Sequence, residues 1–456
     1  MPSIVMKFGG SSVADADAVE RVVAAVEAER AASRTPVVVV SALGGMTDAL
    51  LGLTRHGGAG DAPEIREAAS ELIARHISLG QALGLPAADA ERALDPFPRE
   101  LRQRLEAICR ARTADDATVD AIVALGEMMS SRLIAAVLLA RGLDAAWVDA
   151  REVVMTDARH TCAAPLDETN GACVKVLAPL LAAARIPVLG GFVGRAPDGS
   201  TTTLGRGGSD YSASLVGAAI GASEIQIWTD VDGMLNADPR IVYDAQVVSH
   251  LSFAEASELA YFGAKVLHPS TIFPAVARSI PVRIRNSRRP EASGTLITAD
   301  PPRGNRPFAA LACKRGITVI DITSTRMLMA HGFLRRVFEA FETNETAVDV
   351  VTTSEVSVSV TIDDNRRGPE IVAALLEFAD VTVEEQMAIL TVVGERLATN
   401  STLAARIVGA MTGFPLRMIS QAASRRNLTI VLPEASLAPA MMHLHRELFA
   451  IAEPAR

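Results

Sequence analysis

The chain has 456 residues, more than one hydrophobic core usually serves, so we expect two or three globular domains. The 44 Lys and Arg against 53 Asp and Glu give a formal net charge of −9 without a basic tract, which argues against nucleic acid or an anionic membrane as a partner. We find no signal peptide, no run of about 18 apolar residues, and no CxxC pair or metal-ligand spacing. We therefore expect a cytoplasmic protein that does not span a membrane and has no metal ligands of its own.

Short β-branched runs alternate with helical patterns over roughly the first 300 residues, which predicts an α/β domain with a mostly parallel open sheet covered by helices. The apolar runs are continuous, which indicates strands buried on both faces. The predicted strands are 4–8, 36–43, 186–194, 224–231 and 280–287. The predicted helices are 15–32, 117–142 and 170–185, with a helical excursion over 61–112 that could belong to a lid or an interface.

A proline-rich stretch at 298–308 predicts a domain boundary. Beyond it, strands 317–324, 347–353 and 355–363 with helices 332–344 and 368–380 form one βαββα unit, and strand 381–385 follows it. Strands 387–394, 415–422 and 428–433 with helices 402–413 and 437–450 repeat that order. We predict a catalytic domain over 1–300 and two ferredoxin-like domains over 308–385 and 386–456, with strands exchanged between them and a homo-oligomer formed through them.

The stretch "KFGGSSV" ends a predicted strand at Phe8 and turns through Gly9 and Gly10 into a helix start that Ser11 or Ser12 can cap. Such a turn exposes backbone N–H groups to phosphate. Lys7 precedes the glycines, so the stretch is not the GxxxxGK[ST] loop. A solvent-facing lysine before an ordinary helix start is the alternative.

Three more glycine turns follow predicted strands: "SALGGMTDAL" from Ser41, "GGFVGR" from Gly190 and "TTTLGRGGSD" from Thr201. Turns at the carboxyl ends of strands in one open sheet indicate one shared crevice for a ligand. In the last of them, Arg206 presents a fork of donors suited to a carboxylate or a phosphate. Ser209 and Asp210 could simply cap the next helix.

Two further stretches hold charged residues near predicted loops. In "WTDVDGMLNADPR", the acidic series from Asp230 lacks the spacing and the closing glutamate of an EF-hand. In "FGAKVLHP", Lys265 follows a glycine and precedes Pro269. Lys7 and Lys265 would fit the need for two cations beside a triphosphate.

In this order, "KFGGSSV", "GRGGSD", "WTDVDGMLNADPR" and "FGAKVLHP" resemble the aspartate kinases of the amino-acid kinase family, and the two C-terminal repeats are similar to their ACT domains. The resemblance covers essentially the whole chain and is strongest to the single-function bacterial type, of the lysine-sensitive class. It implies an allosteric enzyme that transfers the γ-phosphoryl group of MgATP to the side-chain carboxylate of L-aspartate. The product, 4-phospho-L-aspartate, begins lysine, methionine and threonine biosynthesis; a specialised pathway stays open.

The resemblance also implies roles for individual residues. The catalytic set is Lys7, Asp210 and Lys265. The aspartate-binding set is Ser41, Thr47, Glu127, Arg206 and Ser209. The nucleotide-binding set is Lys7, Gly9, Gly10, Thr229, Asp230, Arg240 and Lys265. Lys7 would stabilise the phosphoryl group in flight, Arg206 would bind the α-carboxylate and Glu127 the α-ammonium. Leu235 stands where the family often has tyrosine, so we expect weaker ATP binding.

For the ACT repeats, the resemblance implies an amino-acid effector site formed by Met327, Gly332, Phe333, Leu334, Val348, Asp349, Thr353, Ser354 and Glu355. An ordinary strand pair and helix is the alternative for this region. Ala330 and Ala347 replace serines common in lysine-inhibited relatives, and each lost hydroxyl would weaken effector binding by roughly 1 kcal/mol. Lysine, threonine, both or neither could therefore inhibit, and the oligomer could be a dimer or a tetramer.

Two other interpretations of the chain's function stay open. The chain could be a non-catalytic amino-acid sensor on a dead kinase domain, although Lys7, Glu127 and Arg206 are all retained. It could also phosphorylate glutamate, acetylglutamate or UMP, although the paired ACT repeats argue against all three. We expect no fused homoserine dehydrogenase, because no second nucleotide fingerprint is present.

Overall fold

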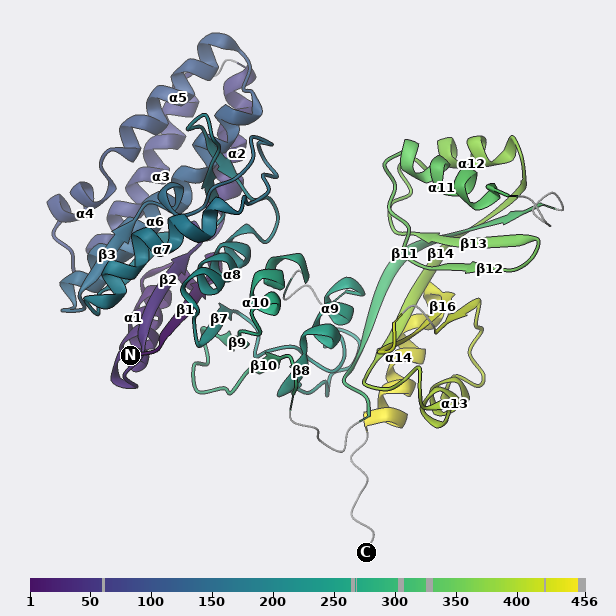
Figure 1. The fold of residues 1–456 in the computed structure, drawn as a ribbon. Helices are drawn as coiled ribbons and strands as arrows, with labels where there is room; N and C mark the ends of the chain where they lie inside the picture. The colour runs from purple at the N-terminus through teal and green to yellow at the C-terminus, as the bar shows by residue number, and fades with distance from the viewer. Residues whose placement is uncertain are drawn as a thin grey trace, which may run out of the picture. The chain divides into compact units, whose positions relative to one another are not determined.

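The computed structural model describes residues 1–59, 62–263, 267, 269–301, 307–324, 331–421 and 424–449. The chain forms two compact units (Figure 1). The first comprises 1–234, 249–253 and 266–301, and the second 235–248, 254–265 and 302–456. The finer division into domains 1–300, 308–385 and 386–456 stays a prediction.

The first unit is built on an eight-stranded sheet of order β3-β4-β2-β1-β7-β9-β10-β8. All neighbouring strands pair in parallel except β9 and β10. The strands are β1 Ser3–Phe8, β2 Thr35–Val40, β3 Ala145–Val148, β4 Ile186–Gly190, β7 Glu224–Thr229, β8 His250–Ser252, β9 Val282–Asn286 and β10 Thr295–Thr298. The predicted mostly parallel sheet is thus confirmed. We did not predict β3, β8 and β10, which are too short to give a clear apolar pattern.

The predicted strand 186–194 is wrong as one element. The main-sheet strand β4 ends at Gly190, and the chain turns at Gly191 and at Phe192, which has φ 67°. It then forms a separate antiparallel hairpin of β5 Val193–Arg195 and β6 Thr201–Thr203. The turn "GRGGSD" therefore follows a hairpin strand and not, as we predicted, a strand of the main sheet.

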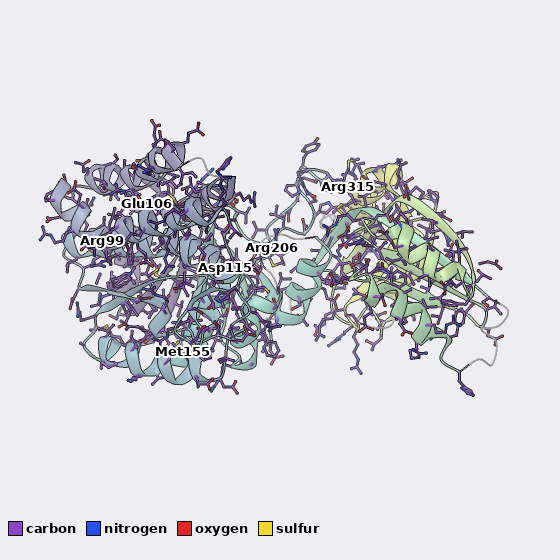
Figure 2. The ribbon with its side chains drawn as sticks, turned by 90° about the horizontal axis from the view of Figure 1, so that it is seen from above. Arg99, Glu106, Asp115, Met155, Arg206 and Arg315 are labelled. Atoms are coloured by element: carbon purple, nitrogen blue, oxygen red, sulfur yellow. The ribbon has the colours of Figure 1, made fainter. Side chains whose placement is uncertain are left out.

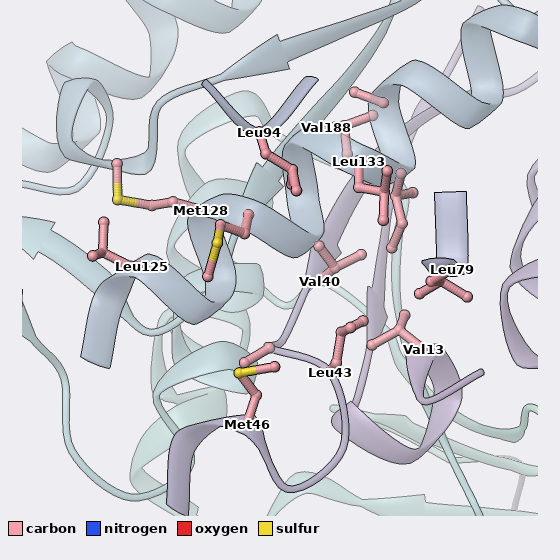
Figure 3. Packing of buried hydrophobic residues seen from close by; sticks show 14 of the residues in the cluster. Val13, Val40, Leu43, Met46, Leu79, Leu94, Leu125, Met128, Leu133 and Val188 are labelled. Atoms are coloured by element: carbon pink, nitrogen blue, oxygen red, sulfur yellow. The ribbon is translucent and has the colours of Figure 1, made fainter. Parts of the chain in front are cut away.

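Helices cover the sheet and build a large core. They are α1 Ala16–Ala31, α2 Met46–Ala59, α3 Ala62–Ala82, α4 Ala87–Leu94, α5 Phe97–Ala111, α6 Asp116–Ala140, α7 Glu168–Ala182, α8 Gly208–Ile220 and α10 Phe273–Ala277. Helix α9 Phe253–Tyr261 belongs, apart from its first residue, to the second unit. The predicted helical excursion 61–112 contains α3, α4 and α5, which share a core with α2 and α6. Figure 3 shows Leu125, Met128 and Leu133 of α6 in the cluster that also holds Val40 and Leu43.

Helix α6 positions part of the site described below. The Asp115 side chain caps it by accepting a 2.8 Å hydrogen bond from the Thr118 N–H. Among the described residues, only this helix is long and apolar enough to cross a membrane. However, 83% of its most apolar window is buried inside the protein, which is typical of the core helix of a globular domain.

The second unit contains a six-stranded antiparallel sheet of order β12-β13-β11-β14-β16-β15. Its strands are β11 Ala310–Thr323, β12 Val351–Thr353, β13 Ser357–Ile362, β14 Asp380–Val393, β15 Met418–Ser420 and β16 Asn427–Pro433. Its helices are α11 Phe333–Thr343, α12 Gly368–Leu376, α13 Ser401–Ala410 and α14 Glu434–Phe449. The order of elements agrees with the two predicted βαββα units.

Strands β11 and β14 are longer than predicted and join the two repeats into one sheet. Each has 14 residues, and β14 runs through the predicted boundary between residues 385 and 386. Their register shifts between Lys314 and Ile317, close to Gly316 with φ 68° and Gln386 with φ 58°. Such an irregularity bends a strand pair. Each half of the sheet has its own hydrophobic core, one with α11 and α12 and the other with α13 and α14.

Candidate active site

The carboxyl ends of the parallel strands meet at one edge of the first unit's sheet, as predicted. A cavity of about 340 Å³ opens there. It is lined by Lys7, Gly10, Ser41, Ala42, Leu43, Gly44, Gly45, Thr47, Asp48, Glu127, Phe192, Gly205, Gly207, Gly208, Ser209 and Asp210. The turns after β1, β2 and β4 and the turn before α8 thus share one crevice.

Lys7 and Asp210 form an ion pair inside this cavity. Lys7 is the penultimate residue of β1, Asp210 lies in the first turn of α8, and Lys7 Nζ is 2.6 Å from Asp210 Oδ1. The side chains are only 12% and 13% exposed. A Cβ on Gly9 would lie 3.6 Å from the ammonium, in ordinary van der Waals contact with it. The carboxylate fixes the lysine at the strand end with its charge facing the cavity.

Glu127 supplies a second ionisable group to the cavity. It lies on α6, is 3% exposed, and its Oε2 has no hydrogen-bond partner among the described atoms. Burial raises its pKa from 4.5 to about 8, although hydrogen bonds with the backbone of Ala42 and of Glu127 itself partly offset this. A buried carboxyl group with a free oxygen is prepared for a cation that enters the cavity.

Two glycines let the predicted substrate residues approach one another. A Cβ on Gly190 would lie 3.0 Å from the Cβ of Glu127, and one on Gly191 would lie 2.7 Å from the Cα of Ser209. With these positions bare, the Ser209 hydroxyl lies 3.0 Å from that of Ser41, which donates to it. Ser41, Thr47, Glu127 and Ser209, predicted from distant parts of the sequence, all line the cavity.

Arg206, unlike the four predicted substrate residues just described, does not line the cavity. Two glycines of its turn adopt the left-handed conformation, with φ 72° at Gly205 and 74° at Gly207. The Arg206 side chain is exposed on the surface (Figure 2), and it is not among the described residues that line the cavity. Binding a carboxylate in the cavity would require the side chain to turn inward.

Among the described residues of the predicted nucleotide set, only Lys7 and Gly10 line this cavity. Thr229 is the last residue of β7 and Asp230 follows it at the same sheet edge, and the Thr229 hydroxyl donates to Asp230 over 3.2 Å. Arg240 belongs to the second unit, where its exposed guanidinium pairs with Asp238 at 2.7 Å. Lys265 lies outside the described residues.

Asp349 is the best-defined of the predicted effector residues. Its side chain is 5% exposed and pairs with Lys314 Nζ at 2.6 Å. The Tyr261 hydroxyl of α9 also donates to it over 3.1 Å, while Asp349 Oδ2 has no partner among the described atoms.

The other described residues of the predicted effector set lie in the core of α11 and α12 or on the surface. Phe333 is buried in the core shared by α11 and α12, and Val348 packs against that core. Gly332, Leu334, Thr353, Ser354 and Glu355 are exposed, and Met327 and Ala330 lie outside the described residues.

Sequence reasoning missed several residues that line the cavity. Phe192 is the clearest: its φ of 67° is rare for an aromatic residue, and strain of this kind is common at functional sites. Its place directly after "GG" was the available signal. Asp48 was missed because a helix-start carboxylate after Thr47 is ordinary in sequence terms. No cluster of three or more potential metal-ligating side chains is present in the part of the chain that the structure describes.

A model of the amino acid kinase family matches residues 2–286, and a model of the ACT domain matches residues 390–448. The first match spans more than half of the chain. The fold and the site therefore define an amino acid kinase joined to a regulatory ACT region.

Comparison with individual proteins narrows this class. The chain is 35% identical to the lysine-sensitive aspartokinase 3 of Escherichia coli, over 98% of this chain and 99% of that protein. The crystal structure of E. coli aspartokinase III with aspartate and ADP, in the R-state, is similar with a TM-score of 0.80 over 98% of this chain and 99% of that one. The T-state structure of that enzyme with lysine and aspartate gives 0.79 at the same coverage. The chain belongs to the aspartokinase family.

Proposed function

We propose that the chain is an ATP-dependent aspartate kinase. The observation that supports this most directly is one cavity that holds both a lysine fixed at a strand end and a buried carboxyl group with an unpartnered oxygen. The lysine suits the charge of a transferring phosphoryl group, and the carboxylate suits the ammonium of an amino acid. The family resemblance to enzymes crystallised with aspartate and ADP agrees with this assignment.

In the proposed reaction, an oxygen of the aspartate side-chain carboxylate attacks the γ-phosphorus of ATP. The bond from that phosphorus to the β-phosphate oxygen breaks, and ADP and 4-phospho-L-aspartate leave. The nucleophile is ionised at neutral pH, so no general base is needed. The protein's task is to align two anions and to neutralise charge, with Lys7 as the principal cation and Asp210 as its anchor.

Magnesium enters this scheme as part of the substrate MgATP. Asp210, an acidic side chain in the cavity, is paired with Lys7, and no metal-binding cluster exists in the described part of the chain. The residues thus fit a metal bound mainly by the nucleotide phosphates, which is the usual mode for Mg²⁺ in kinases. The metal supplies charge neutralisation on the triphosphate.

An aspartate-dependent hydroxamate assay tests the function. Hydroxylamine traps the acyl phosphate, so we expect colour that requires both ATP and aspartate. Hydroxamate from glutamate but not from aspartate would assign a different acidic substrate. No turnover, with lysine or threonine still bound, would favour a sensor on a dead kinase domain.

Arg206→Ala is expected to raise the KM for aspartate about tenfold and to leave the KM for ATP within about twofold, because it removes a charged hydrogen bond to the α-carboxylate. Exposed Arg195, also in the segment that follows β4, is the control: Arg195→Ala should leave both constants unchanged. An effect of Arg206→Ala confined to ATP would contradict the carboxylate role.

We also propose that the ACT region senses an amino acid through Asp349. The ammonium of Lys314 already contacts this carboxylate, and its second oxygen is buried without a partner, so the site attracts amines. The E. coli structure with lysine supports lysine as the first effector to test.

Asp349→Asn is expected to raise the lysine concentration for half-maximal inhibition about tenfold or more, with basal kcat unchanged. Asp363→Asn is the matched control, because Asp363 also contacts Lys314, at 3.1 Å, but is far more exposed. Equal shifts in both variants, or none in either, would remove Asp349 from the effector site. The same titrations with threonine establish which amino acid inhibits.

We also propose that the protein is cytoplasmic and that it forms a homodimer or a homotetramer through the ACT repeats. The four free cysteines, which fit a reducing compartment, support the first. Exposed apolar side chains on α11 and α12, among them Leu334, Phe338 and Leu376, support the second. Sedimentation of the purified chain would give the oligomeric state.

A further inference from the structure

A second buried carboxylate lies on α6, outside the cavity, and the proposed chemistry does not use it. Asp120 is 1% exposed, yet four donors converge on it. Its Oδ2 accepts from His160 Nδ1 at 3.0 Å, from the Thr161 N–H at 2.9 Å and from the Thr203 N–H at 3.1 Å. Its Oδ1 accepts from the Thr203 hydroxyl at 2.6 Å. Because a carboxylate only accepts, the His160 proton must be on Nδ1.

All four donors come from two segments that flank the turn "GRGGSD". Thr203 is the last residue of β6, two positions before Gly205. The segment from His160 to Ala163 lies beside it, since the Ala163 N–H donates to the Thr203 carbonyl over 2.9 Å. A Cβ on Gly205 would lie 3.4 Å from the Thr161 carbonyl oxygen. Asp120 therefore binds both Thr203, which leads into this turn, and the neighbouring segment that begins at His160.

The same helix supplies the proposed ammonium ligand. Asp120 and Glu127 are seven residues apart on α6, about two helical turns, so their side chains leave the helix on the same face. The Asp120 side chain points to the end of the hairpin of β5 and β6, and the Glu127 side chain points to the cavity. The hydrogen bonds of Asp120 thus fix the position of β6 and the following turn relative to Glu127.

We propose that Asp120 is a positioning residue for the amino-acid substrate. It sets the separation between the group that receives the ammonium, Glu127, and the turn that receives the α-carboxylate, through Arg206 and Ser209. This inference rests on the proposed aspartate kinase function and adds to it a residue that does not touch the substrate. A ligand held at both ends is sensitive to that separation, whereas none of the proposed nucleotide-binding residues lies in this turn.

A merely structural role makes a different prediction. Loss of a buried network that only stabilises the fold would lower the unfolding temperature and the amount of active enzyme, with KM values unchanged. Loss of positioning would raise the KM for aspartate selectively. The conservative Asp120→Asn should restore binding, because an amide oxygen can accept from the three N–H groups while its NH₂ donates to the Thr203 hydroxyl.

The experiment compares Asp120→Ala, Asp120→Asn and Thr203→Val with Asp116→Ala, an exposed carboxylate one turn earlier on α6. We expect Asp120→Ala to raise the KM for aspartate about tenfold or more, with the KM for ATP within about twofold. Thr203→Val should give a smaller rise of about threefold, and Asp120→Asn and Asp116→Ala should stay close to wild type.

The possible outcomes distinguish a failure of this inference from a failure of the proposed aspartate kinase function. Equal KM rises for both substrates, or a loss of thermal stability with unchanged KM values, would overturn the positioning role. If Asp120→Ala does not fold, Thr203→Val decides, because valine keeps the shape and removes one donor: an unchanged KM for aspartate there would overturn the role. A wild-type chain without aspartate turnover would instead overturn the proposed function, and this inference with it.

Discussion

Replacing Lys7 with alanine is expected to lower kcat by about three orders of magnitude while the KM for aspartate changes by less than about threefold. The Lys7 ammonium is held at the strand end by Asp210 and faces the cavity, so in the proposed reaction it meets the phosphoryl group when charge is redistributed during transfer. Its removal also leaves the Asp210 carboxylate beside the triphosphate without a countercharge. Steady-state coupling of ADP release with both substrates saturating measures kcat directly.

Two further variants separate this role from general electrostatics. Lys175→Ala removes an exposed lysine on α7 and should leave kcat unchanged. Asp210→Asn keeps the lysine but releases its anchor, and we expect a fall in kcat of about tenfold to a hundredfold. If Lys7→Ala turned over at the wild-type rate, the lysine would not stabilise the transition state.

The strongly apolar strands of the fold were predictable, and the exposed ones were not. The runs that became β1 and β7 are buried on both faces and so have an unambiguous continuous pattern. The first half of β14, by contrast, is mostly exposed, so its polar residues ended the pattern and one strand was read as two. The break of 186–194 at Gly191 was missed because a continuous apolar run does not reveal where backbone pairing stops.

The candidate site likewise contains residues that could be predicted from the sequence and residues that could not. Lys7, Gly10 and Ser209 lie beside glycine turns, which have a physical meaning in sequence terms. Glu127 has no such signal, because it sits inside an apolar helix and only the family resemblance pointed to it. Asp120 was missed, because its four donors come from segments about 40 and 83 residues away in the sequence. Contacts of this kind follow from tertiary packing and have no local pattern.

Glu127→Gln is expected to raise the KM for aspartate about thirtyfold to a hundredfold at pH 8.5, with kcat reduced less than about fivefold. Glutamine keeps the shape and the backbone hydrogen bonds but loses the charge that would pair with the α-ammonium. The KM for ATP serves as the internal control and should stay within about twofold. A selective rise in the KM for ATP would contradict the ammonium role.

The raised pKa of Glu127 adds a pH dependence with a definite sign. Below a pKa of about 8 the free enzyme holds this carboxyl group protonated, and aspartate must displace the proton to gain its ion pair. The wild-type KM for aspartate should therefore fall about tenfold per unit as pH rises toward 8 and then level off. The Glu127→Gln variant should lack this slope.

The proton on the Glu127 carboxyl group also affects the free energy of unfolding of the ligand-free protein. The folded-state pKa is above the unfolded value of 4.5, so the stabilisation is complete below pH 4.5 and is lost as pH rises through about 8. Between these limits the free energy of unfolding of the wild type should fall by up to about 1.4 kcal/mol per pH unit relative to Glu127→Gln. Urea unfolding of both proteins at pH 5.5 and 7.5 measures the difference. If the difference stayed constant with pH, Glu127 would be ionised in the empty cavity, and the slope in KM would have to arise from another group.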